Sequence, residues 1–303
     1  MMDNTEFKKE LEERKKLINK QISAYMPEEK GHQKTIFEAM NYSMNAGGKR
    51  LRPMLLQETC RLFCGEVPGA AVPFMAAIEM IHTSSLVHDD LPCMDDDMMR
   101  RGKASTWAEF GEDIGVLTGD ALMVYAFETA AGAFGEAADA DELARLGKAM
   151  GILASKTGVY GMIGGQTVDV ELAGGPIPKD KLDFIYQLKT GALLEAAMLI
   201  GAGIGGAADE DCRIVESLAG KLGLAFQIQD DILDVTGNAE VTGKPAGSDA
   251  KNQKTTYVTL EGLEQAEKKV KLLSEEAIED LKKLPGNNDF LESLIHILVK
   301  RQK

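Results

Sequence analysis

Residues 226–234 are Phe-Gln-Ile-Gln-Asp-Asp-Ile-Leu-Asp, and their pattern is the plainest indication of a helical fold. Its apolar residues follow helical rather than alternating spacing, which predicts a helix. Asp230 and Asp234 are four residues apart, so their side chains should lie one above the other on that helix. Gln227 falls on the same stripe, three residues before Asp230. The stretch therefore predicts a helix that carries a line of oxygen ligands along one side.

Two stacked carboxylates on a mostly apolar helix repel each other and are costly to desolvate. A divalent cation relieves that cost. Mg²⁺ suits such a site, because it commonly binds a few carboxylates together with the phosphates of a substrate. The alternative is a solvated acidic face of a surface helix. The apolar residues on either side of the aspartates make this alternative less favoured.

Helix-forming residues continue along nearly the whole chain, and alternating runs rich in Val, Ile and Thr are missing. We expect helices over residues 4–24, 33–45, 53–65, 106–134, 140–173, 179–204, 209–235, 255–284 and 288–301, and one more that begins near Pro73 and runs through Val87. Four glycines between residues 158 and 165 predict a kink or break. Residues 236–254 should form an irregular loop. No composition break divides the chain, so the prediction is one all-α domain, residues 1–303.

The composition narrows the classes of function. A net charge of -14 disfavours a nucleic-acid partner, which would require a basic surface. The charged N-terminal segment predicts no signal peptide, and no apolar run reaches the ~20 residues of a membrane span. The four cysteines show neither disulfide nor zinc-site spacing, although Cys60 and Cys64 could share a helix face. We therefore expect buried free thiols in a soluble, cytoplasmic protein that is not embedded in a membrane.

A second acidic cluster lies earlier in the chain. Residues 88–103 are His-Asp-Asp-Leu-Pro-Cys-Met-Asp-Asp-Asp-Met-Met-Arg-Arg-Gly-Lys. Carboxylates followed at once by cations suit a metal-bridged polyphosphate, because the carboxylates hold the ions and guanidinium groups bind the remaining phosphate oxygens. Pro92 makes simple helix spacing unreliable within the cluster. A calcium loop is disfavoured, since alternate aspartates with a closing Glu are absent.

The third feature is a basic turn. Residues 47–53 are Gly-Gly-Lys-Arg-Leu-Arg-Pro, with three cations around a glycine turn that opens a helix. Such a turn predicts an anion site, and a solvated basic turn explains it equally well. His82 lies seven residues before Asp89 on the same helical stripe, which favours a ligand-facing role over that of an ordinary core histidine.

These features, in this order, resemble the trans-isoprenyl diphosphate synthases, and most closely their bacterial farnesyl/geranylgeranyl diphosphate synthase group. The two aspartate-rich motifs of that family match residues 89–95 and 230–234, and its Gly-Gly-Lys-Arg-x-Arg-Pro motif matches residues 47–53. Three further motifs match at residues 164–169, 189–190 and 243–249. The resemblance covers nearly the whole chain. Lys-Ala-Ser-Thr at residues 103–106 departs from the family's usual Lys-Pro-Thr, with the cations intact.

The resemblance implies a bundle of about a dozen helices around one deep cavity, a type I isoprenoid synthase fold, usually as a homodimer. The two aspartate motifs would face each other across the cavity mouth. It implies that three Mg²⁺ ions are held on an allylic diphosphate by Asp89, Asp95 and Asp230, with Asp234 nearby. It also implies that Arg100, Lys189 and Lys244 contact this diphosphate. Isopentenyl diphosphate would be bound by Lys49, Arg52, His82 and Arg101.

The implied reaction is a head-to-tail condensation. Diphosphate leaves an allylic substrate (dimethylallyl, geranyl or farnesyl diphosphate), and the double bond of isopentenyl diphosphate attacks the carbocation that remains. Loss of a proton, for which the departed diphosphate is the implied base, then completes the product. Thr190 and Gln227 could steady this cation through oxygen dipoles; helix packing and a hydrogen bond near the metal face are the plainer alternatives. The resemblance further implies that product length is set just upstream of the first motif, at Ser84 and Ser85.

Farnesyl-producing bacterial relatives usually have an aromatic residue at the Ser84 position. The small Ser84 therefore favours a C20 geranylgeranyl product over a C15 farnesyl product. An adaptable floor could come instead from Met75, Met80, Met123 or Phe127.

Two other functions share parts of this pattern. A terpene cyclase has a helical cavity and one aspartate motif, but it does not need residues 47–53, and its second metal motif mixes Asn, Ser and Glu. A non-catalytic regulatory subunit of a heteromeric prenyl synthase typically lacks some of the aspartates or cations, all of which are present here. The synthase is therefore the favoured hypothesis.

Overall fold

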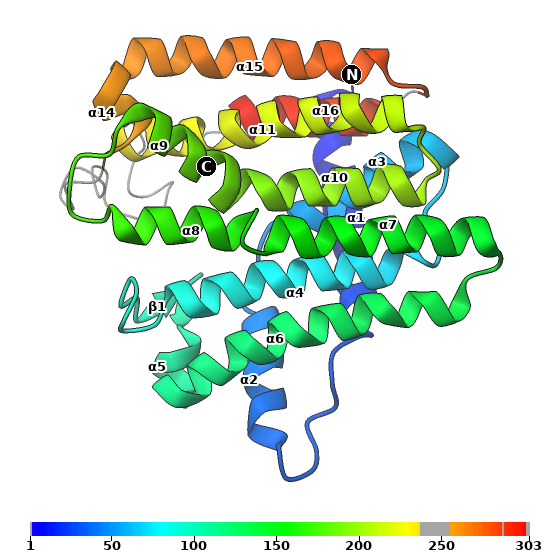
Figure 1. The fold of residues 1–303 in the computed structure, drawn as a ribbon, viewed down its shortest axis with the longest axis vertical. Coiled ribbons are helices and arrows are strands. Elements are labelled where there is room, and N and C mark those ends of the chain that lie inside the picture. Colours follow the sequence, from blue (N-terminus) through cyan, green and yellow to red (C-terminus); the bar gives the residue numbers. More distant parts are fainter. Residues whose placement is uncertain (1, 237–254, 287, 301–303) are drawn as a thin grey trace.

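The computed structural model describes residues 2–236, 255–286 and 288–300, and helices dominate them (Figure 1). The α-helices are α1 (Asn4–Ser23), α2 (Lys34–Met44), α3 (Leu51–Cys64), α4 (Ala71–Asp89), α5 (Thr106–Phe110), α6 (Glu112–Gly132), α7 (Ala140–Thr157), α8 (Met162–Glu171), α9 (Lys179–Ile185), α10 (Ala192–Ile204), α11 (Asp209–Thr236), α14 (Tyr257–Glu261), α15 (Leu263–Lys283) and α16 (Asp289–Lys300). The 3₁₀ turn η1 spans Ala133–Glu136, and the π-turn η2 spans Tyr186–Gly191. The all-α prediction is confirmed.

Several expected helices are interrupted. The predicted helix over residues 106–134 divides into α5 and α6 at Gly111, and that over residues 255–284 divides into α14 and α15 at Gly262. Both glycines have positive φ, 97° and 83°, which ends a right-handed helix and which other residues rarely adopt. The expected break in residues 140–173 lies between Thr157 and Met162. The π-turn inside residues 179–204 was not predicted.

A short hairpin follows the first aspartate cluster and was also not predicted. Strand β1 (Met99–Arg100) pairs antiparallel with β2 (Lys103–Ala104). Its two-residue loop, Arg101-Gly102, has φ of 54° and 79°. Two positive φ values are typical of a type I′ turn, the turn that matches the twist of a hairpin. Strands of two residues are too short to produce an alternating pattern that a sequence could reveal.

Helix α4 forms the centre of the bundle. It packs against α6 along most of its length, and also against α3, α10 and α1. This explains why α4 is apolar on nearly every side rather than along one stripe. In Figure 1 the long helices α15, α11, α10, α7, α4 and α6 run roughly alongside one another, in this order from top to bottom. The C-terminal ends of α4 and α11, which carry the two aspartate motifs, lie at the same end of the bundle, on the left in Figure 1.

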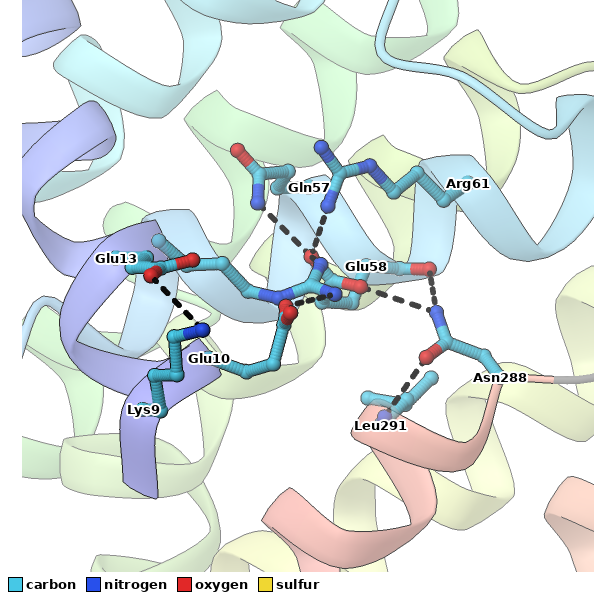
Figure 2. Close-up of polar contacts among 9 residues, drawn as sticks. Lys9, Glu10, Glu13, Gln57, Glu58, Arg61, Asn288 and Leu291 are labelled. Carbon is cyan, nitrogen blue, oxygen red and sulfur yellow. Dashed lines mark hydrogen bonds and ion pairs between the residues drawn. The ribbon is translucent and has the colours of Figure 1, made fainter. Parts of the chain in front are cut away.

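A buried carboxylate ties both ends of the chain to α3. Glu58 is 1% exposed and accepts hydrogen bonds from Arg14 of α1 and from Arg61, at 2.5 and 2.8 Å (Figure 2). Asn288 donates to Glu58 Oε2 at 3.1 Å, and its own Oδ1 accepts from the backbone N–H of Leu291 in α16. A buried charge is tolerated only when it is paired in this way. Through Glu58, α1 and α16 are held against the helix that begins at the basic turn.

The chain has one helix of membrane-spanning character within the described residues. Residues Glu112–Glu136, which comprise α6 and η1, are long and apolar enough to cross a membrane by length and composition. A helix was predicted here, over residues 106–134, but an apolar run of membrane-spanning length was not. The core helix of a soluble protein meets the same criterion, and α6 packs closely against α4.

The cysteines differ in part from expectation. Cys60 is buried, but Cys64 and Cys93 are exposed and Cys212 is half-buried. The prediction that all four thiols are buried is therefore wrong, because Cys64 ends α3 and Cys93 lies in the turn after α4. Cys60 and Cys64 do share a helix face, with their sulfur atoms 3.9 Å apart.

A second charged cluster joins α15 to α11. The buried Asp280 accepts hydrogen bonds from Lys221 at 2.6 Å, Ser217 at 2.9 Å and Lys283 at 2.7 Å. Burial alone would raise the pKa of Asp280, but these donors lower it to about 2. The folded-state pKa thus lies below that of the unfolded chain, near 3.9. The carboxylate stabilises the fold above about pH 4 and loses that contribution as the pH falls toward about 2.

We expect Asp280→Asn to lower the free energy of unfolding at pH 7 by about 2 kcal/mol. The difference from the unaltered protein should shrink between about pH 4 and about pH 2, because protonation removes the same charge. Urea unfolding at several pH values measures it. The control is Asp209→Asn, since the exposed ion pair of Asp209 with Lys148 contributes little. A deficit that is unchanged at pH 2 would contradict the assignment.

Candidate active site

A cavity of about 920 Å³ opens among α4, α6, α8, the π-turn η2 and α10. Its polar lining includes Arg52, His82, Asp89, Gln166, Lys189 and Thr190. Apolar side chains line the rest, among them Leu86, Val116, Met123, Met162 and Leu193. Polar groups that converge on one part of a deep apolar cavity are typical of a small-molecule site.

The first aspartate motif begins where α4 ends. Asp89 is the last residue of α4, three residues before Pro92, which cannot continue the helix. The chain then turns so that the backbone N–H of Asp95 donates to the carbonyl of Asp89, at 2.9 Å. Gln166 of α8 donates to Asp89 Oδ1 at 2.7 Å. The turn therefore keeps Asp89 and Asp95 close together, with Asp89 lining the cavity and Asp95 exposed.

The positive charges near Asp89 do not offset the cost of burying its carboxylate. Its pKa is raised to about 6, mainly by burial and also by the neighbouring Asp95, while Lys189 and Arg100 act in the opposite direction. A cation beside this carboxylate would relieve its desolvation and its repulsion from Asp95. Carboxylate oxygens are also the ligands that Mg²⁺ prefers.

No group of three metal-ligating side chains is assembled within the described ranges. Asp230 is exposed and Asp234 is half-buried near the end of α11, outside the lining of the cavity. This arrangement suits Mg²⁺, which takes one or two carboxylates from a protein and its other ligands from water and substrate phosphates. The residues present therefore fit the ion.

The basic turn lies against the hairpin. The guanidinium of Arg101 donates to the carbonyl of Gly47 and lies so close to Gly48 that a Cβ there would approach Arg101 Nη1 within 2.8 Å. Gly48 also has φ of 131°, so a side chain at this position would be strained as well as crowded. The fold thus brings residues 47–53 next to residues 100–101, which lie far apart in the sequence.

Arg52 and His82 are half-buried members of this cation group and line the cavity. Burial lowers the pKa of Arg52 to about 10, with Glu79 opposing and Arg101 reinforcing the effect. Burial lowers the pKa of His82 well below its usual value, and the charges of Arg52 and Arg101 lower it further. The Nε of Arg52 is buried and has no hydrogen-bond partner within the described chain. A half-buried guanidinium with a buried, unused donor is well suited to bind an anion.

Arg50 differs from the expectation for the basic turn. It has a left-handed φ of 51° and is buried, and it donates to Glu79 Oε1 at 2.7 Å, Asn19 Oδ1 at 2.8 Å and the Met44 carbonyl at 2.6 Å. Arg50 is therefore committed to these partners, and of the three cations in the turn Arg52 is the one that lines the cavity. Glu79 could have been noticed as an acidic residue in the otherwise apolar run of α4.

Arg100 is held by carboxylates. Its Nε donates to Asp90 Oδ1 at 2.8 Å, its Nη2 makes a second contact with the same atom, and Nη2 lies 3.2 Å from Asp97 Oδ2. Asp90 is buried. The second aspartate of the motif thus fixes the arginine of β1 rather than facing the cavity.

The π-turn η2 carries two predicted site residues. Lys189 donates to Asp169 Oδ2 of α8 at 2.6 Å, and Thr190 donates to Gln227 Oε1 of α11 at 2.8 Å. Lys189 and Thr190 line the cavity. The fold therefore brings together three motifs from separate helices, and Asp169 is a partner that sequence reasoning did not assign.

The two serines before the first motif have different surroundings. Ser84 is fully buried and donates to the carbonyl of Gly119 on α6 at 2.8 Å, so it lies in the seam between α4 and α6. Ser85 lines the cavity, and of the four candidate floor residues Met123 does so too. His88, which had no support from the sequence, also lines the cavity. Lys244 and the motif at residues 243–249 lie outside the described residues.

Comparison with known proteins supports the same class. The Polyprenyl synthetase family profile matches residues 33–292. The chain is 43% identical over 260 residues to the farnesyl diphosphate synthase of Geobacillus stearothermophilus, covering 86% of each chain. It is 42% identical over 272 residues to the geranylgeranyl diphosphate synthase of Cyanophora paradoxa, covering 89% of this chain and 88% of that protein.

A solved structure shares the fold. The geranyltransferase of Helicobacter pylori, complexed with magnesium and isoprenyl diphosphate, superimposes with a TM-score of 0.81 at 28% identity, covering 99% of this chain and 98% of that one. The fold and the cavity therefore define an all-α isoprenoid synthase. The chain belongs to the polyprenyl synthetase family.

Proposed function

We propose that this chain is a short-chain prenyl diphosphate synthase, which joins isopentenyl diphosphate head-to-tail to an allylic diphosphate and releases diphosphate. The observation that carries the proposal is that Asp89, Lys189 and Arg52 line one deep, mostly apolar cavity. The relatives named above, which make farnesyl and geranylgeranyl diphosphate according to their names, support the same activity.

The two diphosphates are proposed to bind on different sides of the cavity mouth. The allylic diphosphate lies near Lys189 and Arg100, with Lys244 as a further contact. The isopentenyl diphosphate lies against Arg52, with its buried unused donor, and is held by Lys49, His82 and Arg101 as well. Neutral His82, whose pKa is low, can donate one hydrogen bond without adding to the repulsion among the arginines.

The residues of the π-turn act on the carbocation. Thr190 uses its hydroxyl proton in the bond to Gln227, which leaves the hydroxyl lone pairs available to the cavity. These lone pairs steady the positive charge at C1 of the allylic substrate. Lys189 and Arg100 stabilise the negative charge that grows on the departing diphosphate, which is electrostatic catalysis by groups already in place. The apolar lining excludes water, which would otherwise capture the cation.

Mg²⁺ completes this site. We propose three ions, held by Asp89, Asp95, Asp230 and Asp234, which when bound supply positive charge that stabilises the leaving diphosphate. The enzyme is proposed to act in the cytoplasm as a homodimer.

Incubation of the pure protein with Mg²⁺, isopentenyl diphosphate and each of dimethylallyl, geranyl and farnesyl diphosphate tests the activity. We expect a longer prenyl diphosphate and free diphosphate, and no product after chelation of the metal. Absence of condensation with all three primers would contradict the proposal, and a cyclic hydrocarbon would indicate a cyclase instead.

Product length is proposed to depend on Ser85 and Met123, which line the cavity, more directly than on Ser84. Small Ser85 leaves space beside the first motif, and this favours C20 over C15. We expect Ser85→Phe to shorten the main product by one five-carbon unit, because its ring fills that space. Ser85→Ala is the control and should leave the product distribution unchanged. Chromatography of the dephosphorylated products measures both, and an unchanged length in Ser85→Phe would remove Ser85 from this role.

An exposed apolar face on α6 supports the homodimer. Leu117 and Val124 are exposed, and with Ile114, Ala121 and Ile36 of α2 they line a shallow hollow. Residues 114, 117, 121 and 124 follow the spacing of one helix face. An apolar stripe on the outside of a helix that is buried on its other side is typical of an interface.

We expect Leu117→Glu to convert the dimer to a monomer, because it places a charge in the centre of this apolar face. Light scattering after size-exclusion chromatography gives the mass directly. Leu272→Glu, at an equally exposed leucine on α15, is the matched control and should leave the mass unchanged. A wild-type monomer, or a Leu117→Glu protein that is still dimeric, would overturn this interface.

A further inference from the structure

The π-turn that carries Lys189 and Thr190 is held in place by a carboxylate that no motif assignment explains. Tyr186, the first residue of η2, is buried and donates its hydroxyl to Asp231 Oδ2 at 2.6 Å. The same oxygen accepts from the backbone N–H of Tyr257, the first residue of α14, at 2.8 Å. Asp231 thus joins α11, the π-turn and α14 through one atom.

Asp231 lies inside the second aspartate motif but differs from its neighbours. It is 4% exposed, whereas Asp230 is exposed and Asp234 half-buried. Adjacent residues on a helix point about 100° apart, so Asp231 cannot lie on the stripe that Asp230 and Asp234 share. A buried carboxylate is costly unless donors compensate it, and the tyrosine hydroxyl and the backbone N–H do so here.

The π-turn η2 needs contacts with neighbouring elements to hold its position. A π-turn is rare, and in proteins it occurs mostly as a single turn at functional sites. Here it is confined between two helices by close backbone contacts. A Cβ on Gly165 of α8 would lie 2.3 Å from the backbone nitrogen of Lys189, and one on Gly223 of α11 would lie 2.8 Å from the Cα of Gly191. These contacts limit the position of the turn, and the Tyr186–Asp231 bond sets where it begins.

We propose that Asp231 is a positioning residue and not a metal ligand: through Tyr186 it fixes the π-turn that directs Lys189 and Thr190 into the cavity. The proposal rests on the proposed prenyl transfer for its kinetic consequence, whereas its structural part stands independently. The charge of Asp231 is not required for this role, since a neutral amide oxygen can accept the same two hydrogen bonds.

The experiment compares Tyr186→Phe, Asp231→Asn and Asp231→Ala, with Tyr125→Phe on α6 as the matched tyrosine control and Asp230→Asn as the metal-ligand comparator. The measurements are kcat, the Mg²⁺ concentration for half-maximal rate, and hydrogen exchange of the backbone amides of residues 186–191. Exchange is measured on the metal-free protein and does not depend on activity. Circular dichroism confirms that each variant is folded.

We expect Tyr186→Phe to lower kcat about tenfold, because a small displacement of catalytic groups reduces the rate steeply. Its half-saturating Mg²⁺ concentration should equal that of the unaltered protein. Asp231→Asn should retain most of the activity, whereas Asp231→Ala should lose more activity than Tyr186→Phe. Amide exchange in residues 186–191 should accelerate in Tyr186→Phe and Asp231→Ala but not in Asp231→Asn. Because both partners belong to one bond, Tyr186→Phe should cost little more when it is combined with Asp231→Ala.

Two results would overturn the proposal. One is an Asp231→Asn protein that needs more Mg²⁺, as Asp230→Asn should, which would make Asp231 a ligand. The other is full activity and unchanged exchange in Tyr186→Phe. If Asp231→Ala does not fold, the comparison of Tyr186→Phe with Asp231→Asn still shows whether Asp231 is a positioning residue or a metal ligand. A wild-type protein that forms no prenyl product, together with the expected exchange pattern, would refute the proposed function and leave the positioning role intact.

Discussion

One electrostatic constraint governs the site: some of the carboxylates and cations beside the cavity pair with each other, while others must be able to bind metal or phosphate. If all of them were paired, neither metal nor phosphate would have a partner. The fold meets this constraint with dedicated counter-ions. Asp90 pairs with Arg100, and Glu79 pairs with Arg50. Asp89 and Arg52 line the cavity, and burial shifts the pKa of each toward its neutral form although opposite charges, Lys189 and Glu79, lie near them.

Irregular backbone does much of this positioning. The type I′ turn of the hairpin directs Arg101 back to Gly47, and the π-turn directs Lys189 and Thr190 toward the cavity. Both irregularities occur between well-packed regular elements, since α4 and α11 are long and largely buried along their inner faces. Strained or rare conformations persist where the surrounding packing over-determines them. The rigid helices thus supply the framework, and the short irregular segments supply the directions of the charged side chains.

Two buried carboxylates outside the cavity have a structural role that a count of acidic residues does not reveal. Glu58 holds α1 and α16 on α3, and Asp280 holds α15 on α11. Neither faces the cavity. The acidic residues therefore have three different roles, as proposed metal ligands, as counter-ions and as structural anchors. The net charge of the chain cannot distinguish these roles. Burial and partners separate these classes.

The sequence by itself determined the all-α class, both aspartate motifs, the basic turn and the family, because helical periodicity and local motifs are properties of neighbouring residues. It could not separate Asp230 from Asp231, Lys49 from Arg50, or Ser84 from Ser85, since the members of each pair are adjacent and of similar chemistry. Only the tertiary structure decided these, through contacts with Tyr186, Glu79 and Gly119 from distant parts of the chain. The π-turn and the hairpin likewise arise from packing against other elements, and local residue preferences do not encode them.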